Sequence, residues 1–353
     1  MTRIVLRSLL LIALAAALAG CTGAGYYAES LGGHLRIMAA RKDVAGLVAD
    51  PATPGPLRAR MASASAIRQF ASEALDLPDN RSYRSYVELG RDYVTIAVFA
   101  APEFALAPVA KCFPVFGCVP YQGFFSAQNA RKAAAALQAQ GLDVHVSGVT
   151  AYSTLGWTSD PLLSTMFRGG EAQLAALIFH ELAHQRVYVQ DDSAFNEGFA
   201  VAVEVSGVRK WLRAAGDAEG LRRYEAARAR TADFLGLVAE TRKELHAVYS
   251  GPGTDAQKRA DKEAAIARLG QRYRQMRDRR WNGYGGYDAW FAAPINNARL
   301  ATTSVYNDLV PAFLRLLELC GGDYGRFYTV VERIGKLERA QRVRALEAET
   351  GCG

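Results

Sequence analysis

Two histidines separated by three residues lie in a stretch that has the apolar spacing of a helix. The segment His180-Glu181-Leu182-Ala183-His184 falls within residues 171–189. On a helix, positions i and i+4 share one face, so both imidazoles can reach one ion. With 5 His and 35 acidic residues in 353, such a segment arises by chance less than about 0.01 times per chain. The sequence therefore predicts a helix that carries two metal ligands.

The spacing is that of the zincin motif, in which the intervening Glu181 serves as the general base. A catalytic zinc usually takes three protein ligands and leaves one position open for water. Two downstream acids, Glu197 and Glu204, are candidates for the third ligand. They are seven residues apart and share one helix face, so spacing alone does not separate them.

The segment Asn196-Glu197-Gly198-Phe199-Ala200 resembles a segment of gluzincin aminopeptidases in which the Glu binds zinc. This resemblance implies that Glu197 is the third ligand, together with His180 and His184. The connector between the two zinc helices is shorter here than in that family, so Glu204 remains the alternative.

A wider resemblance covers the chain from just after Cys21 nearly to its end. The chain is similar to the bacterial family of putative aminopeptidase lipoproteins, and this resemblance implies a zinc-peptidase fold and an exopeptidase role on peptide substrates. The similar segments are Cys112-Phe113-Pro114, residues 117–121, residues 151–157, Asp160-Pro161, residues 177–185, residues 195–200 and Asn296-Asn297-Ala298-Arg299.

In such an enzyme Glu181 would take a proton from the attacking water and pass it to the leaving amine. Gluzincins often use a downstream Tyr to stabilise the oxyanion, and Tyr306 is the candidate here; a packed core aromatic is its alternative role. The aminopeptidase motif Gly-Ala-Met-Glu-Asn is absent, which leaves Asp160 or Glu204 to bind the substrate amine. A zinc endopeptidase, or a non-catalytic scaffold with this fold, remains an alternative function.

The chain begins with a predicted lipoprotein signal peptide, residues 1–20. Two arginines precede the apolar run Leu9–Leu18, and Leu18-Ala19-Gly20-Cys21 matches the bacterial lipobox. We therefore expect Cys21 to be acylated and to anchor the protein in the cell envelope. Thr22 favours the outer membrane, with the protein facing the periplasm.

In this compartment four cysteines besides Cys21 can form disulfides. Cys112 and Cys118 bracket a short loop, so a local disulfide is expected there. Cys320 and Cys352 are the remaining pair. A zinc site built from these cysteines is the alternative, but the CxxC spacing of such sites is absent.

The predicted fold class is α+β, mainly α, with a zincin-like small sheet and active-site helix followed by a larger helical half. Helices are expected over 25–49, 57–75 and 127–140, and strands over 92–100 and 143–150. Residues 148–157 are a candidate edge strand for substrate. After the signal peptide, three regions are predicted: an N-terminal helical segment (21–90), a catalytic core (91–207) and a C-terminal helical region (208–353).

The net charge of +7 does not indicate nucleic acid. Loss of Arg3 and Arg7 with the signal peptide lowers the charge to +5. Residues 256–280 contain nine basic and three acidic residues and form one predicted amphipathic helix. An exported lipoprotein is not expected to bind nucleic acid, so this is a solvated helix face or a contact for anionic lipid headgroups.

Overall fold

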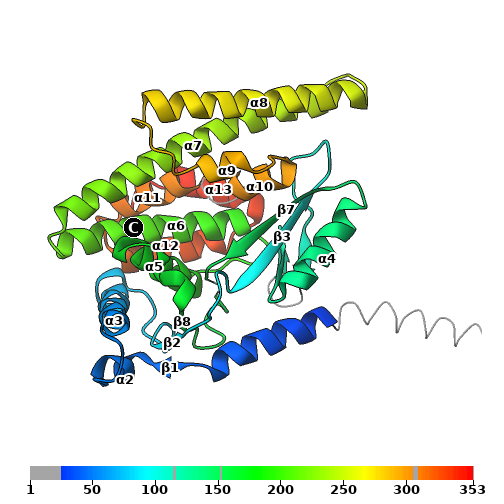
Figure 1. Cartoon of the computed structure of the whole chain (residues 1–353). Helices are drawn as coiled ribbons and strands as arrows, with labels where there is room; N and C mark the ends of the chain where they lie inside the picture. The colour runs from blue at the N-terminus through cyan, green and yellow to red at the C-terminus, as the bar shows by residue number, and fades with distance from the viewer. Residues whose placement is uncertain (1–24, 114–116, 152, 305–308, 353) are drawn as a thin grey trace, which may run out of the picture.

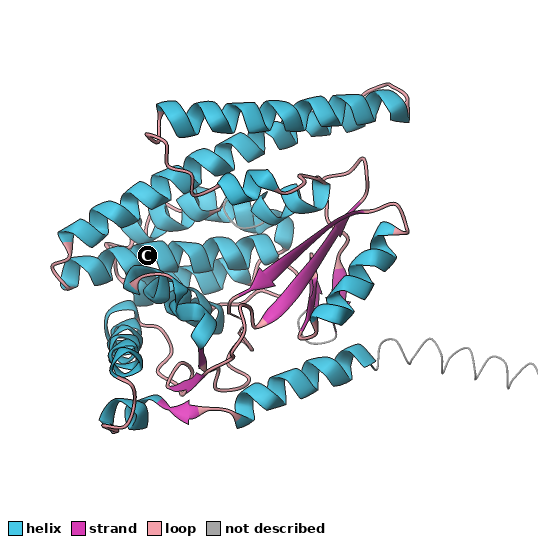
Figure 2. Ribbon diagram, in the orientation of Figure 1, coloured by secondary structure: helices cyan, strands magenta, loops and turns pink. Residues whose placement is uncertain are grey.

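The computed structural model describes residues 25–113, 117–151, 153–304 and 309–352. Helices account for 63% and strands for 9% of the structure, which confirms the predicted mainly-α member of the α+β class (Figure 2). No helix in the described part of the chain combines the length and hydropathy that crossing a membrane requires.

The N-terminal part departs from the single helix predicted over 25–49. Residues 25–39 are helical, but the chain then extends into β1 (Lys42–Asp43) before α2 (Val44–Ala49). The break has a local cause, because the Asp43 side chain caps α2 by accepting a hydrogen bond from the Gly46 amide at 2.7 Å. β1 pairs with β2 (Ser85–Val87), which also pairs with β8 (Leu162–Leu163).

A second sheet has β3 (Thr95–Ala101) between β6 (Gln122–Phe124) and β7 (Asp143–Val149), all antiparallel. Side chains alternate between its faces, as they do along any strand. Val98 packs against α4 (Ala127–Gln138), whereas Ala97 and Phe99 pack with Ala298 of α10 (Asn297–Ser304). Figure 1 shows α4 and α10 beside this sheet. The hairpin of β4 (Lys111–Phe113) and β5 (Gly117–Val119) precedes β6.

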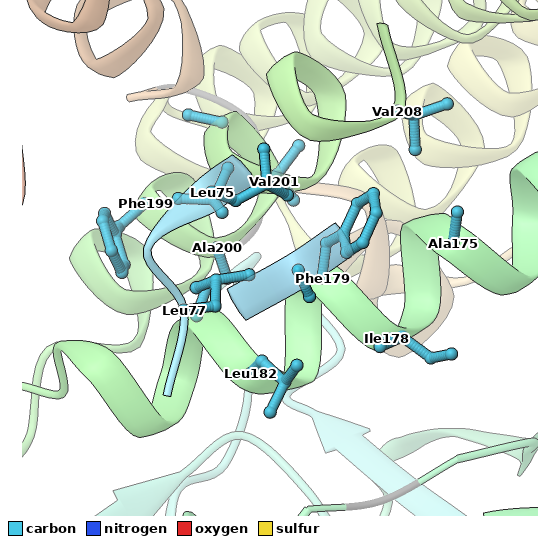
Figure 3. Close-up of a cluster of buried hydrophobic side chains, with 14 of the residues drawn as sticks. Leu75, Leu77, Ala175, Ile178, Phe179, Leu182, Phe199, Ala200, Val201 and Val208 are labelled. Carbon is cyan, nitrogen blue, oxygen red and sulfur yellow. The ribbon is translucent and has the colours of Figure 1, made fainter. Parts of the chain in front are cut away.

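The largest buried cluster is built around α5 (Glu171–Arg186) and α6 (Ser193–Ala214). Phe179, Leu182 and Phe199 lie in this cluster with Leu75, the last residue of α3 (Gly55–Leu75) (Figure 3). A Cβ at Gly207 would lie 2.8 Å from the Phe179 ring, so glycine permits the close approach of α5 and α6. Other helices that contribute to this cluster include the short 3-10 helix η1 (Ser164–Arg168), α11 (Val310–Leu319), α12 (Tyr324–Gly335) and α13 (Arg339–Ala348).

Two long helices, α7 (Ala218–Ser250) and α8 (Asp255–Arg279), form an antiparallel pair along one side of the molecule (Figure 1). They have their own buried cluster, in which Phe234, Leu269 and Trp281 pack beside the short helix α9 (Asp288–Ala292). α7 ends at Ser250, before the segment Gly251-Pro252-Gly253, and α8 ends at Arg279.

Candidate metal centre

The two motif histidines lie on one face of α5, as their spacing predicts. The opposite face of this helix is buried through Ile178, Phe179 and Leu182 (Figure 3). The Nε2 atoms of His180 and His184 lie 3.2 Å apart. His184 is buried and His180 is partly exposed, so the pair lies at the edge of the core.

Glu197 of α6 completes a cluster with these two nitrogens. Its carboxylate lies 3.3 Å from His180 Nε2 and 3.6 Å from His184 Nε2. One ligand atom from each of the three residues lies within 4.8 Å of the others, and the group could hold a metal ion. Two imidazoles and one carboxylate are a donor set that suits a catalytic zinc.

Glu204 occupies a different position. Its carboxylate lies 3.1 Å from His180 Nδ1, the ring nitrogen on the side away from Glu197. Glu197 and Glu204 therefore lie on either side of one imidazole, and only Glu197 contacts both Nε2 atoms. A carboxylate on the second nitrogen of a ligating His fixes its tautomer and ring orientation.

The charges of the cluster reinforce one another. Burial alone would lower the pKa of His180, but hydrogen bonds that its ring donates to Glu197 and Glu204 outweigh burial and raise this pKa well above its usual value. Burial opposes ionisation of Glu197, yet hydrogen bonds from His180 and His184 lower its pKa. Burial raises the pKa of Glu181, although both histidines act against it. His180 and Glu197 thus each favour the charged form of the other.

The connector between α5 and α6 is held by a side chain of the gluzincin-like segment. Asn196 Oδ1 accepts a hydrogen bond from the Val189 amide at 2.7 Å, and its Nδ2 donates to the Val189 carbonyl at 2.7 Å. Asp192 caps α6 by accepting from the Phe195 amide. The Asn next to Glu197 is therefore a structural residue, which fixes where α6 begins and where Glu197 points.

Asp160, a candidate for the substrate amine, is engaged elsewhere. Its side chain is 2% exposed, and its two oxygens accept from the Thr154 amide at 2.9 Å and the Thr154 hydroxyl at 2.8 Å. It therefore holds the loop after β7. The edge strand predicted over 148–157 is therefore shorter than expected. β7 does lie at the edge of its sheet, but it ends at Val149.

Sequence reasoning missed two tyrosines on which the carboxylates of the site act, and an arginine that holds the loop before one of them. The charges of Glu181 and Glu197 act on Tyr121, and the charge of Glu181 acts on the buried Tyr83. Tyr83 has a left-handed backbone, with φ of 62°. The loop before Tyr83 is held by Arg68, a buried residue of α3, whose guanidinium donates to the carbonyls of Pro78, Asn80 and Ser82 at 2.7, 3.1 and 2.9 Å.

A sequence signal for one of these residues existed. Arg68 occupies an apolar-periodic position of α3, in line with the buried residues Met61, Ala64 and Ala71. A lone Arg in such a stripe indicates a buried hydrogen-bonding role. Tyr83 and Tyr121 come from a loop and a strand connection, and no periodic pattern marks them.

The remaining predicted residues fall into two groups. Cys21 and Tyr306 lie outside the described residues. The structure contains disulfides between Cys112 and Cys118 and between Cys320 and Cys352. Asn297, of the C-terminal similar segment, is fully buried and donates to the carbonyls of Pro102 and Glu103, so it joins α10 to the end of β3.

Comparisons with known proteins give one match. No curated protein and no solved structure matches the chain. A family model described as "Putative aminopeptidase" matches residues 25–346, which is most of the chain and includes α5 and α6. The chain therefore belongs to this family of putative aminopeptidases.

Proposed function

We propose that this protein is a zinc-dependent peptidase that acts as an aminopeptidase. The observation that carries the proposal is the convergence of His180 Nε2, His184 Nε2 and the Glu197 carboxylate within 4.8 Å of one another, beside Glu181. Membership of the family supports the peptidase class. Zinc is favoured because two imidazoles and one carboxylate leave a coordination position open.

Each residue of the cluster has a distinct task. His180, His184 and Glu197 hold the ion, and Glu204 orients His180 through Nδ1. When bound, zinc polarises the peptide carbonyl and acidifies water. Glu181 accepts the proton of the attacking water and delivers it to the leaving amine.

The proposed setting is the cell envelope. The predicted signal peptide and Cys21 support a lipid anchor, and Thr22 supports the outer membrane, with the catalytic part in the periplasm. Peptides in that compartment are the proposed substrates.

The Glu181→Gln variant tests the reaction class. It removes the base but keeps the ligands, so we expect about one zinc per chain, as in wild type, and hydrolysis reduced by about 10²–10⁴-fold. Zinc is measured by elemental analysis and hydrolysis with amino-acid arylamides. Undiminished hydrolysis by zinc-loaded Glu181→Gln protein would contradict the proposal.

Peptides with free and N-acetylated termini test the aminopeptidase assignment. An aminopeptidase cuts the free peptide only, because it must bind the α-amine. Equal cleavage of both peptides would instead identify an endopeptidase.

A further inference from the structure

A small disulfide-closed hairpin lies beside the candidate metal centre and has no role in the function proposed so far. Strands β4 and β5 pair antiparallel with Cys112 opposite Cys118, and a disulfide joins these two residues. A two-stranded ribbon this short is only marginally stable alone, and the disulfide holds its two strands together. Pro120 and Tyr121 follow the hairpin directly, so the position of the hairpin constrains the position of the Tyr121 backbone.

The hairpin is attached to the connector that joins the two metal-binding helices. The Cys118 amide donates a hydrogen bond to Asp191 Oδ1 at 2.8 Å. Asp191 has a left-handed backbone, with φ of 59°, and precedes the Asp192 cap of α6. Because Asn196 ties the same connector at Val189, the hairpin and the start of α6 are fixed to one another.

Tyr121 is held from its other side by the sheet. Its ring lies 5.3 Å from the ring of Phe99 on β3, and the next residue begins β6, which pairs with β3. Tyr121 belongs to the cluster that contains Ala97 and Phe99, yet it remains partly exposed. Its ring is therefore packed against β3 while part of the side chain stays accessible to solvent.

The surroundings of the phenol identify where it points. Burial, then the charge of Glu197 and that of Glu181, raise the pKa of Tyr121 to about 12. Glu197 and Glu181 are therefore the carboxylates whose charges act on this phenol, and it stays protonated at neutral pH. A neutral phenol beside these two groups is a hydrogen-bond donor.

We propose that Tyr121 is a catalytic residue, which donates a hydrogen bond to the peptide oxygen that gains negative charge, and that the Cys112–Cys118 hairpin holds it in place. This inference rests on the proposed peptidase function. Water oxygen adds to the carbonyl carbon, Glu181 receives the water proton, and the C–N bond then breaks as the amine takes that proton. The Tyr121 proton stays on the phenol throughout and only shifts toward the carbonyl oxygen.

The first test is Tyr121→Phe in the full-length chain, since it removes the hydroxyl and keeps the ring against Phe99. Loss of one oxyanion donor lowers kcat by about 10²–10³-fold. KM and zinc content should stay within about threefold of wild type, because the donor acts mainly in the transition state. Affinity for a phosphinic dipeptide analogue, measured by calorimetry, should fall with kcat. Unchanged kcat and analogue affinity would overturn the proposal.

Tyr306→Phe is the comparison variant for the same role. If Tyr306→Phe causes the large loss of kcat and Tyr121→Phe does not, the oxyanion donor is Tyr306 and the proposal is overturned. The expected result is the reverse order.

The chain offers a matched control for the disulfide. We expect Cys112→Ser/Cys118→Ser to lower kcat by about tenfold or more, and added Tyr121→Phe to cost little further, since both changes remove one interaction. Cys320→Ser/Cys352→Ser removes the distant disulfide, and its activity per folded, zinc-loaded molecule should match wild type. Equal losses from both cysteine pairs, or full additivity with Tyr121→Phe, would refute the role of the hairpin.

Failure of the proposed function and failure of the Tyr121 assignment give different results. If wild type shows no hydrolysis that depends on Glu181, the proposed function itself is wrong. If that hydrolysis is present and Tyr121→Phe retains it in full, only the assignment of Tyr121 is wrong.

Discussion

At the scale of single residues, Glu197 and Glu204 differ in the nitrogen of His180 that each contacts. Glu197 lies 3.3 Å from Nε2, whereas Glu204 lies 3.1 Å from Nδ1. Helical spacing gives both carboxylates the same face of α6 and so cannot divide their roles. Which nitrogen of His180 each carboxylate meets depends on how α5 and α6 pack, and Gly207 permits their close approach at Phe179.

Arg68 gives a stability prediction at the same scale. Arg68→Ala removes the donor to the Pro78 and Ser82 carbonyls and one of two donors to the Asn80 carbonyl, so we expect a loss of about 3 kcal/mol in the free energy of unfolding. Arg60→Ala, an exposed change on the same helix, should cost about 0.5 kcal/mol or less. Urea denaturation measures both variants, and equal losses would show that the Arg68 contacts are not stabilising.

Much of the site could be predicted from residues 180–204, because helical period places His180 and His184 together. Tyr83 and Tyr121 could not be predicted in this way. They reach Glu181 only through tertiary packing: Arg68 holds the loop before Tyr83, and the disulfide hairpin precedes Tyr121. Local sequence patterns carry no information on such contacts.

At the scale of elements, the predicted helices and strands are largely present, and the clearest error is at residues 40–43. Apolar spacing continues from residue 25 to Val48, so periodicity alone extends the helix across the break. The Asp43 cap and the pairing of Lys42 with Tyr86 end that continuity. The sequence signal for this break was Asp43, a capping residue followed by the apolar residues of a new helix.

The basic helix α8 is better explained by ion pairing within the protein than by its charge alone. Lys262 lies 2.7 Å from Asp143, and Arg259 pairs with Glu103, so this helix is joined to the ends of β7 and β3. Further pairs join Arg268 to Glu244, Arg272 to Glu240 and Arg280 to Asp233. Acidic residues of other elements thus neutralise much of the excess positive charge of residues 256–280.

His145 on β7 gives a pH prediction. Burial, and then the charge of Arg299, lower the pKa of His145 to about 4, from about 6.5 in an unfolded chain. The unfolded chain therefore binds the proton first, and stability falls as pH drops from about 6.5 to 4. In His145→Gln the loss in the free energy of unfolding over this pH range should be smaller by only about 1 kcal/mol, because solvent screens part of the effect of a partly exposed histidine.

Urea denaturation at pH 7 and pH 5 measures this difference. The control is His246→Gln, which changes an exposed residue of α7 and should keep the wild-type loss. An identical pH dependence in His145→Gln and wild type would refute the assignment.

At the scale of the whole molecule, the helix over 25–39 has two apolar faces. Its inner face packs through Tyr26, whose ring lies 5.6 Å from that of Phe124, and through buried Ile37. On its outer face Tyr27, Leu31 and Leu35 are 49%, 60% and 56% exposed. This outer face follows the predicted lipid anchor closely in sequence, and a membrane interface would cover its apolar side chains.

Fractionation of bacterial cells tests the anchor. We expect wild type in the membrane fraction and Cys21→Ser in soluble fractions, because acyl chains provide the membrane affinity. Thr22→Ser, a matched change beside the lipobox, should remain with membranes. Cys21→Ser protein that sediments with membranes as fully as wild type would contradict lipid anchoring.

The central claim concerns which carboxylate binds the metal, and zinc affinity in two matched variants tests it most directly. Glu197→Gln removes a ligand, so the purified protein should retain little zinc after dialysis. Glu204→Gln removes only the partner of His180 Nδ1, so zinc should bind, with affinity reduced by about 10–100-fold. The reverse result, with zinc lost from Glu204→Gln and retained by Glu197→Gln, would contradict the account.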